Sequence, residues 1–295
     1  MTSKKYQNFI FFSAGPIGDH VLLLDVANHF YKATGIPSKI LVKNPNPFIN
    51  DLSAPYRFCA EMVRAKKFSN PKLLLLLVQS IFVRNCFILF FPIPAPTYLK
   101  VFAYVIRFCT RSRIIGFNLE GTRSFPLNTG YVSWLGNKNT LPLLDEPFTP
   151  SANRMLSFLG FQPIAWVPKL TYTEDEQVFT KYNLTKKEYI VFHITPSGTF
   201  RSLPTDRWNS IIKEVLTKTD CPIIFSGGEK DSTFINECLS GIDSKRVHVL
   251  AGILSTRELL TVYQYAIVAV VVQTGNGLIV NMQHVPTVIV NIKGT

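Results

Sequence analysis

Two kinds of apolar pattern follow one another along the chain. Short unbroken apolar runs are typical of buried strands, whereas apolar residues that recur every three or four positions predict helices. In the first half, apolar runs predict strands at 9–13, 39–42, 86–91 and 113–117, and helical periodicity predicts helices at 19–33, 72–83 and 97–109. This alternation is typical of a parallel sheet with helices on both faces.

The alternation restarts after a weakly patterned stretch at 118–150. A helix is expected at 151–159, and Pro163 and Pro168 mark a linker. Beyond it, strands are expected at 189–193, 222–226, 247–251, 267–272 and 287–291, and helices at 205–216, 255–265 and 278–283. The predicted fold class is α/β, with two Rossmann-like parallel-sheet lobes, 1–165 and 166–295, that face a central cleft.

The composition agrees with two ordinary domains. The chain has 295 residues, of which 47% are hydrophobic and 17% are charged. Its five cysteines show no metal-binding or paired spacing, so we expect no zinc site and no disulfide framework, as in a reducing cytosol. The apolar run at 9–12 is too short for a signal peptide. The richest apolar stretch, 73–105, is interrupted by charges and prolines, so no membrane span is expected.

Positive charge is concentrated in the first half of the chain. The formal net charge is +12; residues 1–150 hold 17 Lys and Arg against 7 Asp and Glu, and residues 151–295 hold 14 against 12. This asymmetry predicts an anionic partner, such as lipid headgroups or a phosphorylated acceptor, although a merely soluble basic surface would give the same count. Nucleic acid is disfavoured because basic and aromatic residues interleave only at 56–58. The cations expected to contact the acceptor or membrane are Arg57, Arg64, Lys66, Lys67 and Lys72.

Three loops of the second half follow predicted strands and carry candidate ligand-binding groups. The loop HITPSGTFRSLP (193–204) combines hydroxyls, a glycine backbone and one arginine before a helix, which suits a diphosphate. Its candidate residues are Thr195, Ser197, Gly198, Thr199 and Arg201. In the loop SGGEKD (226–231), Glu229 can accept hydrogen bonds from ribose hydroxyls. Each loop also fits an ordinary polar connection.

The third loop lies in VVVQTGNGLIVN (270–281). Its strand is expected to end at Gln273, and the segment from Thr274 through Gly275 to Gly277 exposes backbone amides before a short helix. That arrangement favours a phosphate, although a tight strand-to-helix turn explains it equally well.

The glycine loop in SAGPIGDHVLLL (13–24) raises a separate question. Gly15 and Gly18 are separated by two residues and no lysine follows, so the loop matches neither the P-loop nor the dinucleotide-binding fingerprint. Asp19, which follows, suits either a helix cap or a catalytic carboxylate.

In their order along the chain, these segments resemble glycosyltransferase family 9, the lipopolysaccharide heptosyltransferases. The resemblance rests on YIVFHITPSGTFRSLPTDRW, PIIFSGGEKD and VHVLAGILSTRELLTVYQYAIVAVVVQTGNG, and in the first half on FFSAGPIGDHVLLLDVANHF, RIIGF and MLSFLGF. It implies the GT-B fold, in which two Rossmann-like lobes enclose a nucleotide-sugar cleft.

The resemblance also implies roles for particular residues. Asp19 occupies the position of the catalytic base, and Glu229 falls near the acidic residue that contacts the nucleoside. The residues that match the donor-diphosphate elements are Thr195, Arg201, Thr274 and Gly275. The sequence departs from the family where Gln273 replaces an aspartate and where Leu278 stands near the position of a histidine.

The expected function is that of an inverting, metal-independent glycosyltransferase. The expected donor is an ADP-sugar, the acceptor is an anionic glycolipid of the lipopolysaccharide-core type, and no cofactor is implied. No Asp-x-Asp sequence is present to bridge a metal and a diphosphate. The expected location is the cytoplasmic face of the membrane. Two alternatives remain: a nucleotide-sugar epimerase of the same fold, and a catalytically degenerate nucleotide-sugar-binding protein.

Overall fold

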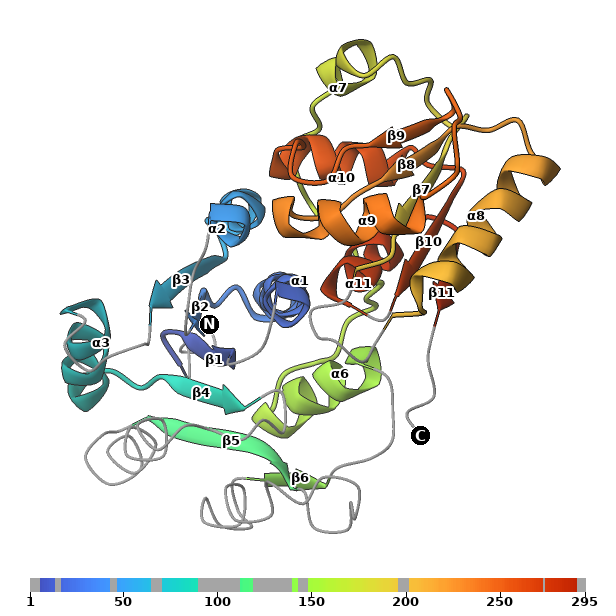
Figure 1. Cartoon of the computed structure of the whole chain (residues 1–295). Coiled ribbons are helices and arrows are strands. Elements are labelled where there is room, and N and C mark those ends of the chain that lie inside the picture. Colours follow the sequence, from blue (N-terminus) through green and yellow to red (C-terminus); the bar gives the residue numbers. More distant parts are fainter. Residues whose placement is uncertain are drawn as a thin grey trace. The chain divides into compact units, whose positions relative to one another are not determined.

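The chain divides into two compact units. The computed structural model describes residues 6–13, 17–42, 47–64, 71–89, 112–118, 140–142, 148–195, 202–272 and 274–290. The first unit spans Met1–Pro168 and the second spans Lys169–Thr295 (Figure 1). Both are built on parallel sheets with helices, so the predicted α/β class is confirmed, whereas the cleft expected between the lobes stays a prediction.

The described part of the first unit contains a six-stranded parallel sheet in the order β3-β2-β1-β4-β5-β6. Its strands are β1 (Phe9–Ser13), β2 (Ser38–Val42), β3 (Ala60–Arg64), β4 (Cys86–Leu89), β5 (Arg113–Asn118) and β6 (Thr140–Pro142). The chain first adds strands on one side of β1 and then on the other. The direction of winding therefore reverses between β1 and β4.

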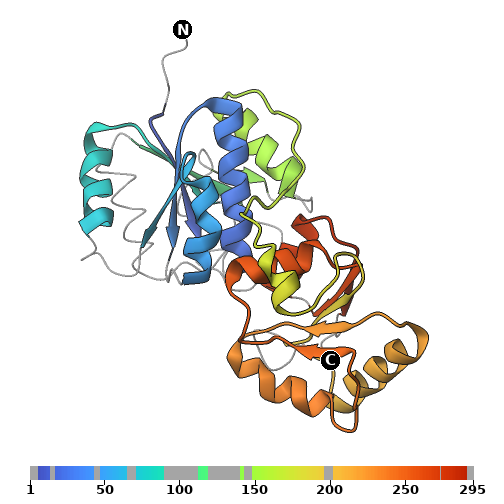
Figure 2. The same cartoon turned by 90° about the horizontal axis from the view of Figure 1, so that it is seen from above.

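Helices lie on both sides of this sheet. They are α1 (Ile17–Thr34), α2 (Pro47–Ser53), the 3-10 helix η1 (Ala54–Tyr56), α3 (Pro71–Phe82) and α6 (Phe148–Leu159). Figure 2 shows the strands of this unit between α3 on one side and α1 on the other. Helix α1 ends where Gly35 adopts a φ of +67°, a conformation that most side chains disfavour.

Helix α1 is central to the first unit because every residue from 20 to 30 is buried. The ring of Phe30 packs edge-on against both Phe9 and Phe11, with centroids 5.2 Å away in each case. Polar groups on the same helix hold the segment after α6. The indole of Trp166 donates to Asp25 at 2.9 Å and stacks on the ring of His29 at 4.6 Å. Burial lowers the pKa of His29, which keeps this stacked imidazole neutral near pH 7.

The second unit has a five-stranded parallel sheet among its described residues, in the order β11-β10-β7-β8-β9. Its strands are β7 (Ile190–His193), β8 (Ile223–Phe225), β9 (Val247–Val249), β10 (Val268–Val272) and β11 (Thr287–Val290). Strands β8 and β9 continue on one side of β7, and β10 and β11 on the other. The winding of this unit therefore reverses between β7 and β10.

The described helices of the second unit are α7 (Gln177–Lys181), α8 (Thr205–Lys218), the 3-10 helix η3 (Glu229–Asp231), α9 (Ser232–Cys238), α10 (Thr256–Gln264) and α11 (Gly275–Met282). Helices α8 and α9 contribute to a core in which Trp208 is fully buried with Phe192 and Phe225. Helix α10 begins with a capping box, since Ser255 accepts from the backbone of Glu258 while the Glu258 carboxylate accepts from the backbone of Ser255.

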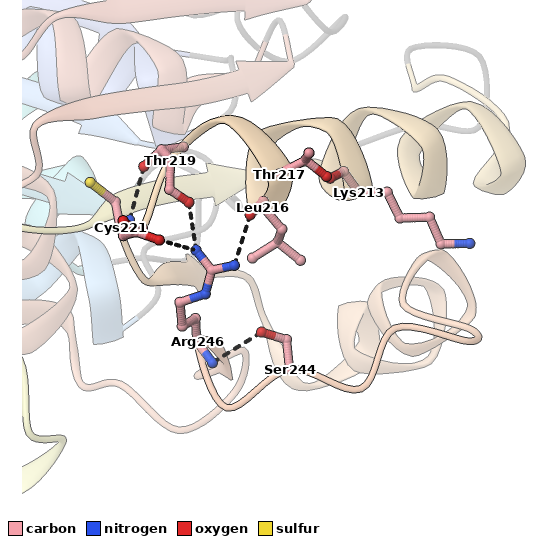
Figure 3. A network of polar contacts seen from close by, with 8 residues as sticks. Lys213, Leu216, Thr217, Thr219, Cys221, Ser244 and Arg246 are labelled. Carbon is pink, nitrogen blue, oxygen red and sulfur yellow. Dashed lines mark hydrogen bonds and ion pairs between the residues drawn. The ribbon is translucent and has the colours of Figure 1, made fainter.

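Arg246 holds the carboxyl end of α8 (Figure 3). Its guanidinium donates to the backbone carbonyls of Leu216, at 2.7 Å, and of Thr219. The Thr219 hydroxyl in turn accepts from the backbone of Cys221 at 2.9 Å. A cation at a helix carboxyl terminus satisfies carbonyls that have no partner within the helix. This network lies where α8 leads into β8, before the strand begins.

Several elements differ from the sequence predictions. The patterns gave no sign of β3, β6 or α9. The helix predicted at 97–109 lies outside the described residues. The prediction of a loop at 274–277 and a helix from 278 was wrong, because α11 begins at Gly275. Gly275 and Gly277 have low helix propensity, so the sequence pattern did not predict the first turn of α11. Both glycines fit a tight strand-to-helix connection.

Candidate functional site

The reversal of winding between β7 and β10 defines a candidate site in the second unit. In open parallel sheets, ligands bind beyond the carboxyl ends of the strands at such a switch point. His193 of β7 is in register with Val271 of β10, so the segments that follow these two residues leave the sheet at the same edge. Two of the three loops proposed from sequence therefore start at this switch point.

Two threonine hydroxyls at this edge have no hydrogen-bond partner among the described residues. Thr195 lies two residues beyond β7 and is 6% exposed, and Thr274 lies two residues beyond β10. The Oγ1 atoms of both are buried without a partner. A buried hydroxyl without a partner costs about 1–3 kcal/mol, so such a pair needs an explanation. A ligand with acceptor oxygens that binds here would provide one.

The amino terminus of α11 lies at the same place. Thr274 is its N-cap but forms no side-chain cap, so the first backbone amides lack that partner. Gly277 lets the helix start close to the sheet, because a Cβ atom there would come 3.2 Å from Cγ2 of Val271. Helix amino termini attract anions through free amides and the helix dipole.

A buried polar network joins this turn to three other elements. The side-chain amide of Asn276 lies 2.9 Å from Nε2 of His193. Nδ1 of His193 lies 3.2 Å from the hydroxyl of Ser226, after β8, and 3.3 Å from that of Tyr263, in α10. Burial lowers the pKa of His193 to about 4, so the imidazole is neutral near pH 7 and can accept from Asn276.

Sequence reasoning gave no role to His193, Ser226 or Tyr263. His193 ends an apolar strand, and a histidine there is indistinguishable from an ordinary core residue. The available signal was its position as the first letter of the loop proposed for the diphosphate.

Glu229 lies at the neighbouring strand end. It is exposed, opens η3, and follows the last residue of β8 by four positions. Gly252, with a φ of +76°, packs against it so closely that a Cβ atom at position 252 would come 2.6 Å from Cα of Glu229. The backbone amide of Gly252 also donates to the carbonyl of Gly227 at 2.9 Å. The position of Glu229 therefore depends on a glycine at 252.

Part of the predicted donor site lies outside the described residues. These residues are Ser197, Gly198, Thr199, Arg201 and Gln273. Ser202, the residue after Arg201, is held by two hydrogen bonds. Its hydroxyl donates to the carbonyl of Ile194 at 2.7 Å and accepts from the indole of Trp208 at 2.9 Å. Gly275 is in the first turn of α11. The structure thus brings Thr195, Thr274 and Gly275 to one switch point.

In the first unit, Asp19 lies in the first turn of α1, beyond the carboxyl end of β1 and next to that unit's own switch point. Its side chain is outside the described set.

Of the predicted basic cluster, Arg57 and Lys72 are exposed. The side chain of Arg64 and all of Lys66 and Lys67 lie outside the described residues. Among the described residues of both units, no group of three or more His, Cys, Asp and Glu side chains could hold a metal ion.

A cavity of about 620 Å³ occurs elsewhere in the second unit. It is lined by Tyr172, Lys187, Gln264, Tyr265 and His284, among others, which precede β7, β10 and β11. It therefore lies toward the amino ends of the strands, at the edge of the sheet opposite to Thr195 and Thr274.

No protein-family model matches the sequence, and no curated protein matches it. Solved structures do match. The glycosyltransferase family 9 protein from Veillonella parvula gives a TM-score of 0.68 at 13% identity, over 97% of this chain and 80% of that one. The ADP-heptose lipopolysaccharide heptosyltransferase II of E. coli gives 0.67 at 13%, over 96% and 84%. A putative UDP-N-acetylglucosamine 2-epimerase from Listeria monocytogenes gives 0.58 at 9%, over 96% and 79%.

These matches show that the chain has the α/β fold of GT-B-type nucleotide-sugar enzymes. Of the three structures, the two glycosyltransferases give higher TM-scores than the epimerase. The fold expected from the resemblance to family 9 is therefore confirmed. A separate finding concerns membranes: within the described residues, no helix is long and apolar enough to cross one.

Proposed function

We propose that this protein is an inverting, metal-independent glycosyltransferase that moves a sugar from an ADP-sugar to an anionic glycolipid. The observation that carries the proposal is the pair of buried, unpartnered hydroxyls of Thr195 and Thr274 beside the amino terminus of α11. They lie at the switch point of a fold shared with an ADP-heptose heptosyltransferase.

The donor diphosphate binds at this switch point. The two hydroxyls and the first amides of α11 donate to its oxygens, and Arg201 adds the positive charge. The sequence places Ser197, Gly198 and Thr199 in the same loop as Arg201. Glu229, exposed at the end of the next strand, accepts from the ribose hydroxyls.

Asp19 acts as the general base in the reaction. It removes the proton of an acceptor hydroxyl, whose oxygen forms a bond to the anomeric carbon as the bond from that carbon to the diphosphate breaks. The proton stays on the carboxyl, and the electron pair of the broken bond leaves with the nucleoside diphosphate. Arg201 and the amides of α11 stabilise the departing charge, so no metal is needed.

The sugar is a heptose or a close relative of it. The residue before Thr274 is the neutral Gln273. Leu278, in helix α11, has an apolar side chain. Neutral hydrogen bonds are about half as strong as charge-assisted ones, so the site holds the nucleotide more selectively than the sugar.

The acceptor is a glycolipid of the lipopolysaccharide-core type, reached from the cytoplasmic face of the membrane. Support comes from the excess of cations in residues 1–150, 17 Lys and Arg against 7 Asp and Glu. Such a field attracts phosphorylated headgroups.

Calorimetric titration with ADP, ADP-heptose and a UDP-sugar tests the nucleotide assignment. ADP and ADP-heptose should bind with free energies that differ by about 1 kcal/mol or less, and Arg201→Ala should weaken both by about 1.5–3 kcal/mol. Binding of the UDP-sugar without binding of ADP contradicts the assignment. Epimerisation of a nucleotide sugar without acceptor indicates the epimerase, and binding without any turnover indicates a degenerate enzyme.

A further inference from the structure

Helix α3 exposes an apolar face. Its large apolar side chains are exposed as follows: Leu74 55%, Leu75 56%, Val78 45%, Ile81 44% and Phe82 74%. At 3.6 residues per turn these positions fall within an arc of about 120° around the helix axis. A continuous apolar face in contact with water loses the main favourable term of folding, so it marks a surface that binds something.

The opposite face of α3 attaches the helix to its unit. Leu76 and Ser80 are 3% and 0% exposed. The Ser80 hydroxyl donates to the carbonyl of Leu76 at 2.7 Å and accepts from the side-chain amide of Asn85 at 3.0 Å. A surface helix of a soluble domain normally turns its apolar stripe inward. Helix α3 instead buries Leu76 beside a satisfied hydroxyl and leaves five large apolar side chains exposed.

The charge of the sequence on either side of α3 indicates the partner. Between Arg57 and Arg84 the sequence has six Lys and Arg residues and a single acid, Glu61. Lys72, in the first turn of α3, is 68% exposed and lies 3.5 Å from that carboxylate, which also pairs with Lys39 at 2.8 Å. This excess of positive charge attracts anionic headgroups. A second copy of the chain would bring the same cations against one another, which opposes association.

We propose that α3 lies in the interfacial region of an anionic bilayer, with its exposed face among the acyl chains. The helix has 12 residues and is therefore about 18 Å long, shorter than a hydrocarbon core of about 30 Å. It lies in the plane of the interface, as amphipathic anchoring helices do. The basic residues that precede and follow it in the sequence contact the headgroups.

This inference rests on the proposed function for its purpose, since a glycolipid acceptor is presented at a membrane surface. Vesicle binding is nevertheless measured without nucleotide or acceptor, and nucleotide binding without vesicles. Failure of the vesicle experiment therefore leaves the donor-site proposal standing, and failure of ADP to bind leaves the membrane proposal standing.

The test is co-sedimentation of the full chain with phosphatidylcholine vesicles that contain or lack phosphatidylglycerol. The variant Leu75→Gln/Val78→Gln/Phe82→Gln removes apolar surface without touching the core, because all three side chains are exposed. The matched control, Ile253→Gln/Val288→Gln/Ile289→Gln, changes three exposed apolar residues of the second unit. The α3 variant should partition roughly 10- to 100-fold less strongly into anionic vesicles, and the control should match the parent chain.

Salt separates insertion from simple charge attraction. The parent chain should keep part of its vesicle binding at about 0.5 M NaCl, where headgroup attraction is screened, and the α3 variant should lose all of it. Equal binding of the two at every salt concentration overturns the proposal. A lipid-free dimer that dissociates in the α3 variant also overturns it, because the face would then bind a second copy of the chain.

Discussion

The side-chain amide of Asn276 and the imidazole Nε2 of His193 lie 2.9 Å apart, which ties the first turn of α11 to the end of β7. The amide donates to the ring nitrogen, so the imidazole proton is on Nδ1, facing the hydroxyls of Ser226 and Tyr263. The contact is a partly buried, neutral support for the proposed diphosphate site. It holds the amino terminus of the helix and the strand end together in the absence of a ligand.

Removing the unpartnered hydroxyls should change ligand affinity and stability in opposite directions. Thr195→Val or Thr274→Val should weaken ADP binding by about 1.5–3 kcal/mol, because a hydrogen bond to a charged diphosphate is lost. The free energy of unfolding should stay the same or rise, because a buried hydroxyl without a partner is removed. Calorimetry with ADP and urea denaturation give the two values.

Thr261→Val is the matched control for that pair. Thr261 is fully buried, but its hydroxyl donates to the carbonyl of Arg257 at 2.8 Å and accepts from the backbone of Asp175 at 2.9 Å. This variant should lose about 1–3 kcal/mol of stability and keep its ADP affinity. If Thr195→Val behaves like Thr261→Val, the hydroxyl of Thr195 has a structural role and the diphosphate does not bind there.

His193 should make the protein less stable in acid. Its pKa is lowered to about 4 mainly by burial, with partial opposition from Asp231 and from a hydrogen bond with Ser226. The unfolded chain therefore binds the proton first as the pH falls. The stability due to the neutral imidazole is complete above about pH 6.5 and is lost toward pH 4, by at most about 3 kcal/mol. Denaturation of the parent chain and of His193→Gln across this range measures the difference.

The same histidine can be followed by the chemical shift of its ring protons. In the parent chain, the His193 signal should not titrate above about pH 5. Asn276→Asp places a carboxylate next to Nε2 and should raise the pKa of His193, whereas Asn276→Ala should not. An ordinary titration near pH 6.5 in the parent chain would show that the imidazole is not buried as the structure has it.

Gly252 should be intolerant of any side chain. In Gly252→Ala, the new Cβ would meet the backbone of Glu229 at 2.6 Å, so the loop must shift in addition to the strain of a positive φ. Gly241, with a φ of +69° and nothing within 4 Å, provides the control. We expect Gly241→Ala to lower the free energy of unfolding by about 1 kcal/mol. Gly252→Ala should lower it by at least about 1 kcal/mol more than that.

The ligand readout connects Gly252 to the proposed nucleoside contact. Gly252→Ala should also weaken ADP binding because it displaces Glu229, and Gly241→Ala should leave the affinity unchanged. Equal ADP affinities for both variants would argue that Glu229 does not contact the nucleoside.

The sequence predicted the strands that are continuous apolar runs and missed those that are not. The runs FIFFS and VAVVV, at β1 and β10, are unambiguous, and Phe9–Phe12 and three residues of β10 are buried. Strand β3, with the sequence AEMVR, lies at the edge of its sheet, where polar residues are tolerated, so its pattern is weak. Strand β6 has only three residues and ends in a proline, which no periodicity can reveal.

The site was predicted as separate loops, and their grouping needed the order of the strands. Periodicity does not tell which strand lies beside β7, and β10 begins 75 residues after β7 ends. The order of the strands in the sheet decides it. Once β7 and β10 are neighbours, Thr195 and Thr274 belong to one site. The role of His193 could not be predicted, because it depends on contacts from α10, α11 and the end of β8.

Asp19→Asn is the most direct test of the proposed chemistry. If Asp19 removes the acceptor proton, the amide should lower turnover by about 10²- to 10⁴-fold and leave ADP affinity unchanged. As a partner of the α1 dipole alone, the carboxylate is worth about 0.3–1 kcal/mol of stability and nothing in turnover. Asp51→Asn, an exposed carboxylate of α2 in the same unit, is the control and should change neither. Steady-state kinetics with saturating ADP-sugar decide the matter, and near-normal turnover in Asp19→Asn returns Asp19 to a helix-terminal role.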